Sequence, residues 1–229
     1  ILGESLMPKG NMSIELLEND REFEKIILNL VQTKFATTAL RSIDKIKQKI
    51  KPIVFQALNE CPEMKELKSG TKLRAELGLK KTDATNAADS IAKTVSQAIT
   101  VTFDRSLGTK DIKGGILLNV QPRDYQNVLN IPKASVFYKP NDRLDWLDWL
   151  LNKGDSIIVS GFHFTPVTNR KVDGGRTGLG TMKQGGNWRI DPVYSGTSDD
   201  NFITRALRKK ENISLISTEI FKVIMSNWK

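Results

Sequence analysis

The spacing of apolar residues changes near residue 100, and this change constrains the fold more than any other feature of the chain. Before it, apolar residues recur every three or four positions, which is typical of amphipathic helices. After it, short runs rich in Val, Ile and Phe are divided by Gly, Pro and Asn, which is typical of strands. The 229 residues therefore predict a single α+β domain over 13–229, helical over 13–99 and 198–228 and rich in strands over 100–195.

The helical half follows an extended leader over residues 1–12. Ser13 is a suitable N-cap for a helix over 14–33, whose first turns are rich in acids. A second amphipathic helix is predicted over 36–58, with lysines on its outer faces. Pro52 is expected to kink or restart that helix, because proline removes a backbone donor and clashes with the preceding turn.

The remaining elements are inferred from caps, breakers and local periodicity. Asp83 is a suitable cap for a helix with a face of small residues, and Ser198 or Asp199 begins another helix. Further helices are expected over 124–129, 142–151 and 213–228, and strands over 100–103, 115–120, 134–138 and 155–164. We expect the long helices to pack on a mixed, mainly antiparallel sheet.

A glycine-rich basic segment from Arg170 to Arg189 interrupts the strand pattern with six glycines, five cations and one acid. Glycine allows a close backbone approach to a partner, and arginine can fork onto a carboxylate or a phosphate. We predict an extended arm over 166–190 that contacts another subunit or DNA. Its expected contact residues are Arg170, Lys171, Arg176, Met182, Lys183, Trp188 and Arg189. A hairpin without a partner is the alternative that composition leaves open.

The expected helix over 142–151 is a second candidate contact region. It carries more apolar residues than one narrow stripe can bury, including Trp146 and Trp149. We therefore expect two of its faces to be covered, in part by a neighbouring subunit. Asp145 and Asp148 are expected on its exposed side.

The charge balance favours an anionic partner. Lys and Arg number 35 against 26 Asp and Glu, a net charge of +9 that suits phosphate, an anionic membrane or an acidic protein surface. A well-solvated basic surface is the plainer alternative. The single Cys61 excludes an intramolecular disulfide, and no apolar run has the length of a membrane span. Together with the absence of a signal-peptide pattern, these features favour assembly inside a cell and no membrane partner.

Patterns for catalysis and cofactor binding are not found. The glycines near residue 180 match neither the phosphate-binding loop nor the dinucleotide fingerprint, in which Lys183 stands where the third Gly belongs. His163, the only histidine, has no partners at metal-ligand or catalytic spacing, and a position on a sheet surface is the simpler interpretation. We therefore expect no enzyme activity, no cofactor and no metal site.

Several motifs resemble virion structural proteins of tailed bacteriophages. Residues 144–158 read LDWLDWLLNKGDSII, and 175–182 read GRTGLGTM. They are followed by Trp188-Arg189-Ile190, Gly196-Thr197 and NFITRA at 201–206. Those phage proteins carry a Trp-rich helix-to-strand turn and an Arg-Thr-Gly loop in this order. A weaker likeness, in residues 39–80, is to the tail-completion and head–tail joining family of minor tail proteins.

The resemblance implies a subunit that is repeated in a ring at the neck or tail of the virion, assembled in the host cytoplasm. Copies of itself and other neck or tail proteins would be its partners, with nonspecific contact to DNA in the lumen. A sequence-nonspecific nucleic-acid-binding protein is the alternative, because the lysine-rich helix and the arginine segment suit a phosphate backbone.

Overall fold

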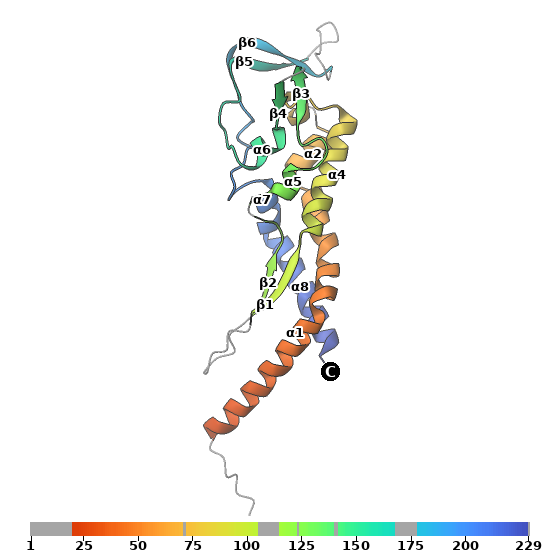
Figure 1. The fold of residues 1–229 in the computed structure, drawn as a ribbon, viewed down its shortest axis with the longest axis vertical. Helices are drawn as coiled ribbons and strands as arrows, with labels where there is room; N and C mark the ends of the chain where they lie inside the picture. The colour runs from red at the N-terminus through yellow and green to blue at the C-terminus, as the bar shows by residue number, and fades with distance from the viewer. Residues whose placement is uncertain are drawn as a thin grey trace, which may run out of the picture.

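The fold is elongated and built around one long helix (Figure 1). A computed structural model describes residues 20–70, 72–104, 115–122, 124–139, 142–167 and 178–228. The long helices are α1 (Asp20–Asn59), α4 (Lys81–Gln97) and α8 (Lys210–Asn227). The short ones are α2 (Pro62–Lys68), α3 (Leu73–Glu76), α5 (Gln126–Leu129), α6 (Trp146–Leu151) and α7 (Phe202–Arg208). Together with the strands below, they confirm the α+β class.

Helix α1 is continuous over 40 residues, or about 60 Å at the usual rise per residue. The helices expected over 14–33 and 36–58 are therefore one over the described residues, and of the expected kink or restart at Pro52 the restart does not occur. Ile50 and Val54, on either side of the proline, are fully buried. Their burial favours a continuous helix and offsets the hydrogen bond that Pro52 cannot donate.

The core lies where α1 packs against α4 and α8. Helix α4 presents a face of alanines with Ile91 and Val95, all fully buried, and these small side chains let the helix backbones approach closely. The small-residue face expected after Asp83 is thus confirmed. Asp83 is not the cap, however: α4 begins at Lys81, and the Asp83 carboxylate lies 3.5 Å from the Lys133 ammonium.

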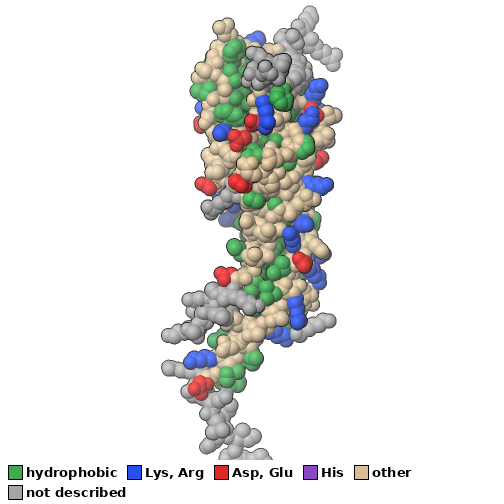
Figure 2. Space-filling view, viewed as in Figure 1, with side chains coloured by type: hydrophobic (Ala, Val, Ile, Leu, Met, Phe, Trp, Pro, Cys, Tyr) green, Lys and Arg blue, Asp and Glu red, His purple; other side chains and the backbone are tan. Residues whose placement is uncertain are grey.

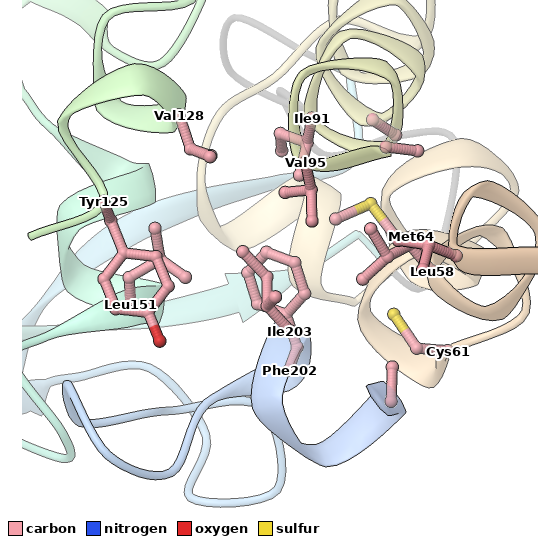
Figure 3. Packing of buried hydrophobic residues seen from close by; sticks show 14 of the residues in the cluster. Leu58, Cys61, Met64, Ile91, Val95, Tyr125, Val128, Leu151, Phe202 and Ile203 are labelled. Atoms are coloured by element: carbon pink, nitrogen blue, oxygen red, sulfur yellow. The ribbon is translucent and has the colours of Figure 1, made fainter. Parts of the chain in front are cut away.

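Helix α7 inserts two apolar side chains into the middle of this core. Figure 3 shows Phe202 and Ile203 between Tyr125 and Leu151 on one side and a group of α1–α2 side chains on the other, with α4 above them. The group consists of Leu58, Cys61 and Met64. Both inserted side chains are fully buried, and burial of each contributes roughly 2 kcal/mol. The neighbouring Cys61 is also buried and unpaired, as expected for a small apolar residue.

The strands form three antiparallel pairs. β1 (Thr100–Asp104) pairs with β2 (Gly115–Asn119), β3 (Val136–Lys139) with β4 (Asp142–Leu144), and β5 (Val159–Pro166) with β6 (Gly180–Trp188). Within the described part of the chain these pairs do not join into the one mixed sheet that was expected. Residues 142–144, expected to begin a helix, form β4 instead, and α6 is confined to Trp146–Leu151.

Asn201 holds the start of α7 to the rest of the core. It is fully buried and is the N-cap, so the helix begins later than the expected Ser198 or Asp199. Its Oδ1 accepts hydrogen bonds from the backbone N–H groups of Ile203 (3.1 Å) and Thr204 (3.2 Å). Its Nδ2 donates to the Tyr125 hydroxyl (2.9 Å) and to the Thr197 carbonyl (2.9 Å). Every polar atom of the side chain therefore has a partner, as a buried amide requires.

Two neighbours show how closely this region packs. The Tyr125 hydroxyl donates onward to the Ser198 carbonyl (3.1 Å), which holds Tyr125 at a left-handed φ of 53°. That backbone conformation is costly for a tyrosine. At Gly196, an added Cβ would lie 2.6 Å from both the Leu150 carbonyl oxygen and the Asn201 Cβ. Glycine is therefore needed there.

None of the helices, over the residues that the structure describes, has the length and apolarity of a membrane span.

The substitution Asn201→Ala removes the cap of α7 and leaves buried polar groups without partners. We expect it to lower the free energy of unfolding by about 3 kcal/mol, measured by urea denaturation followed by circular dichroism. Asn119→Ala, at an exposed position in β2, is the matched control and should change stability by less than about 0.5 kcal/mol. Equal losses in the two variants would contradict this role for Asn201.

Candidate interaction surface

Strands β5 and β6 form a two-stranded ribbon at one end of the molecule (Figure 1). The pairing runs from Val159 opposite Trp188 to Pro166 opposite Gly180, with a bulge between Ser160 and Phe162. Neither strand pairs with a third strand in the described residues. The ribbon therefore presents backbone donors and acceptors along both outer edges, which is the arrangement that accepts an added strand.

The two faces of the ribbon differ in chemistry. Phe162, Phe164 and Met182 share one face, where Phe164 lies opposite Met182. Phe162 and Met182 remain 43% and 40% exposed. His163 and Lys183 are paired on the other face. One face thus offers apolar contacts to a partner, and the other offers a cation and an imidazole.

Glycine has a specific purpose at several ribbon positions. A Cβ at Gly180 would lie 2.2 Å from the Phe164 ring, so the missing side chain leaves room for that ring. Gly185 and Gly186 have φ values of 106° and 73°, which glycine adopts without strain. The resulting backbone brings the Gly185 carbonyl 2.7 Å from Nδ1 of His163, which donates to it. His163 lies exposed on the ribbon, as expected for a histidine on a sheet surface.

The base of the ribbon is attached to the body by charged and aromatic side chains. Arg189 lies 3.4 Å from the carboxylate of Asp155, and Asp191 forms an ion pair with Lys72 just before α3. Trp188 is 7% exposed, and its indole N–H has no hydrogen-bond partner among the described residues. A buried donor without a partner is uncommon, so this N–H is left to donate to an acceptor outside the described residues.

The ion pair of Lys72 and Asp191 lies beside a carboxyl group that resists ionisation. Burial raises the pKa of Glu76 to about 7, Lys72 opposes the rise, and the negative charges of Asp191 and Glu66 add to it. The hydrogen bond from Lys72 lowers the pKa of Asp191, and the same bond raises the pKa of Lys72. The attachment of the ribbon to α3 therefore includes one group that titrates near neutral pH.

The predicted contact residues fall into three groups. Arg170, Lys171 and Arg176 lie outside the described residues. Met182, Lys183 and Arg189 are exposed on the ribbon or at its base, so their side chains are accessible to a partner. Trp188 and the α6 residues Trp146 and Trp149 are wholly or partly buried within this chain.

Trp146 is covered by its own chain and not by a neighbour. Its side chain is fully buried, and its indole N–H donates to the Lys133 carbonyl at 2.7 Å. Leu147, Leu150 and Leu151 are also fully buried. These buried side chains share one broad face of α6, and the cover of Trp146 leaves that side chain with no surface for a partner.

Sequence reasoning missed the strand at 180–188, which it assigned to an extended arm. Three glycines lower the strand propensity of this stretch, and glycine is depleted in ordinary strands. The available signal was alternation: Thr181 and Lys183 point to one face, and Met182 and Gln184 to the other.

The described residues offer several groups that suit contact with a partner. They contain no group of three or more His, Cys, Asp or Glu placed to hold a metal ion. Cys61 has its pKa raised to about 12, chiefly by burial, which disfavours the reactive thiolate. The accessible chemistry of the ribbon consists of open strand edges, apolar side chains and cations.

Comparisons of the chain with protein-family models, with curated proteins and with solved structures find no match. The likeness to tailed-phage virion proteins therefore rests on the sequence motifs alone.

The raised pKa of Glu76 gives a pH dependence with a definite sign. The folded state favours the protonated carboxyl, so ionisation destabilises it progressively as pH rises from about 4.5 through 7. We expect Glu76→Gln to match the wild type near pH 5 and to exceed its unfolding free energy at pH 8 by about 1 kcal/mol, a figure reduced for partial solvent exposure.

Urea denaturation at pH 5, 6, 7 and 8 measures this difference, with Glu60→Gln at the exposed position just after α1 as the control. A gap between Glu76→Gln and wild type that stays constant over this range would contradict the assignment.

Proposed function

We propose that this chain is a non-enzymatic structural subunit of a tailed-bacteriophage virion. It forms an oligomeric ring at the neck or tail, in the manner of tail-completion, connector or terminator proteins, and so joins head to tail. The resemblance of residues 39–80 and 142–206 to such proteins suggests this role. The observation that carries the proposal is the β5–β6 ribbon, a projecting element with two open edges and exposed apolar side chains.

Ring assembly is consistent with the distribution of apolar residues between the core and the surface. The core is closed within one chain, with Trp146 and Phe202 fully buried. Large apolar side chains nevertheless remain exposed on the ribbon, on α1 and on α8, including Phe162, Leu30 and Phe221. Exposed apolar surface of this extent is typical of proteins that associate. The open edges of the ribbon can add a strand to the sheet of a neighbouring subunit.

The charge distribution favours protein contact over nucleic acid. Many cations of the described residues are already paired with carboxylates, among them Lys68 with Asp89, Lys153 with Asp148 and Arg205 with Glu63. Lys and Arg side chains are also spread along the visible face and do not gather in one patch (Figure 2). A phosphate backbone is better matched by a continuous basic stripe.

Native mass spectrometry of the purified chain tests this proposal. We expect one discrete mass equal to a whole number of chains greater than two, since a ring is a closed assembly. A monomer at every concentration would contradict the proposal. If that monomer also bound DNA of any sequence and released it on addition of salt, the nucleic-acid alternative would replace it.

A further inference from the structure

Lys72 is placed to pair with either of two carboxylates. It directly precedes α3, and Glu76 is the last residue of that helix. The Glu76 N–H donates to the Lys72 carbonyl (2.9 Å), so the two residues are one helical turn apart and share a face of α3. The Lys72 ammonium nevertheless pairs with Asp191, which lies shortly after β6. A change in the exposed Lys72 side chain alone would bring its charge from Asp191 to Glu76.

The pair of Lys72 and Asp191 joins α3 to the turn that follows the ribbon. Within this turn, the Asp191 carbonyl accepts hydrogen bonds from the N–H groups of Tyr194 (2.8 Å) and Ser195 (3.0 Å). One oxygen of the Asp191 carboxylate accepts from the Val193 N–H (3.0 Å), and the other binds Lys72. Asp191 therefore both shapes the turn and attaches it to α3.

Charged groups from three segments act on Glu76. Glu66 of α2 and Asp191 disfavour its ionisation, whereas Lys72 favours it. The Glu66 carboxylate also accepts a hydrogen bond from the Lys72 N–H (3.3 Å), which keeps α2 close to the start of α3. Burial raises the pKa of Tyr194 further, so its hydroxyl stays neutral near neutral pH.

Two further charged side chains of α2 and α3 have partners of their own. Arg74 donates to the Gly70 carbonyl (3.1 Å), and Glu63 forms an ion pair with Arg205 (2.8 Å). Among the described residues, Lys72 is therefore the cation that acts on Glu76.

Ionisation of Glu76 weakens the hold of Lys72 on Asp191. Because burial raises the pKa of Glu76 to about 7, about a tenth of this carboxyl is ionised at pH 6 and about nine-tenths at pH 8. Lys72 and Asp191 stay charged over this range, since their hydrogen bond raises the pKa of Lys72 and lowers that of Asp191. Ionised Glu76 attracts Lys72 along its own helix and repels the Asp191 carboxylate.

We propose that Lys72, Glu76 and Asp191 form a pH-sensitive latch between α3 and the base of the β5–β6 ribbon. With Glu76 protonated, Lys72 holds Asp191, and the turn over 191–195 is attached to α3. With Glu76 ionised, Lys72 is shared with the carboxylate of its own helix, and the turn is released. Buried Ile190 keeps the base of the ribbon on the core, so the change is confined to the turn. The latch belongs to one chain and does not depend on ring assembly.

Distances between two spin labels at pH 6 and pH 8 test the latch. The labels are placed at Val193→Cys in the turn, which is 69% exposed, and at Asn86→Cys on the outer side of α4. Cys61 is buried and should take up little label. We expect one narrow distance distribution at pH 6 and a second component at pH 8, because two arrangements of the turn are then populated.

Variants within the latch assign the change to its members. Glu76→Gln is neutral at both pH values and should give the narrow distribution at both. Lys72→Met has no charge to hold Asp191 and should give the second component at both. Glu60→Gln, which leaves the latch intact, is the control and should behave as the wild type does. Circular dichroism checks that each labelled variant is folded.

Three results would overturn the proposal. The first is a wild-type distribution that is the same at pH 6 and pH 8. The second is a pH response in Glu76→Gln equal to that of the wild type, which would assign the change to another group such as His163. The third is a narrow distribution in Lys72→Met at both pH values, which would mean that the turn is held without the ion pair.

Discussion

The buried amide of Asn201 is the interaction on which the rest of the structure most depends. It caps α7 and donates to the Tyr125 hydroxyl ahead of α5 and to the Leu151 carbonyl at the end of α6, so three separate segments meet at one side chain. With α7 fixed, Phe202 and Ile203 lie among side chains of α4, of α6 and of the segment before α5 (Figure 3). Both side chains are fully buried there, and the fully partnered polar network of Asn201 fixes where α7 begins.

The hydrophobic core is formed entirely by side chains of one chain, so only surfaces outside that core remain for partners. Helix α6 shows the principle, because its tryptophan-rich sequence suggested a subunit contact while Trp146 is fully buried by its own chain. The ribbon and the projecting end of α1 have no such cover in the described residues. The two features lie at opposite ends of the elongated molecule (Figure 1). A subunit with contacts at both ends is suited to meeting different neighbours along an axis.

The sequence predicted those parts of the fold in which local pattern and burial agree. The helical periodicity of α1 and α8 and the small-residue face of α4 correspond to buried faces in the structure. It predicted poorly where tertiary contacts override local preference. Helix α1 continues through Pro52 because flanking side chains are buried, and a glycine-rich stretch forms β6 because Phe164 and the bulge need those glycines. For the candidate surface, the sequence singled out Met182 and Lys183, which are exposed, but it did not predict the paired strands that carry them.

The central claim, that this chain is a ring subunit of a phage neck or tail, is tested most directly by electron microscopy of virions that contain it. Averaged images with the chain labelled by a bound antibody fragment would show its axial position and symmetry. The account predicts label in one ring at the head–tail junction or on the tail, repeated around the axis. Purified particles without the label, or label scattered over the capsid, would contradict it.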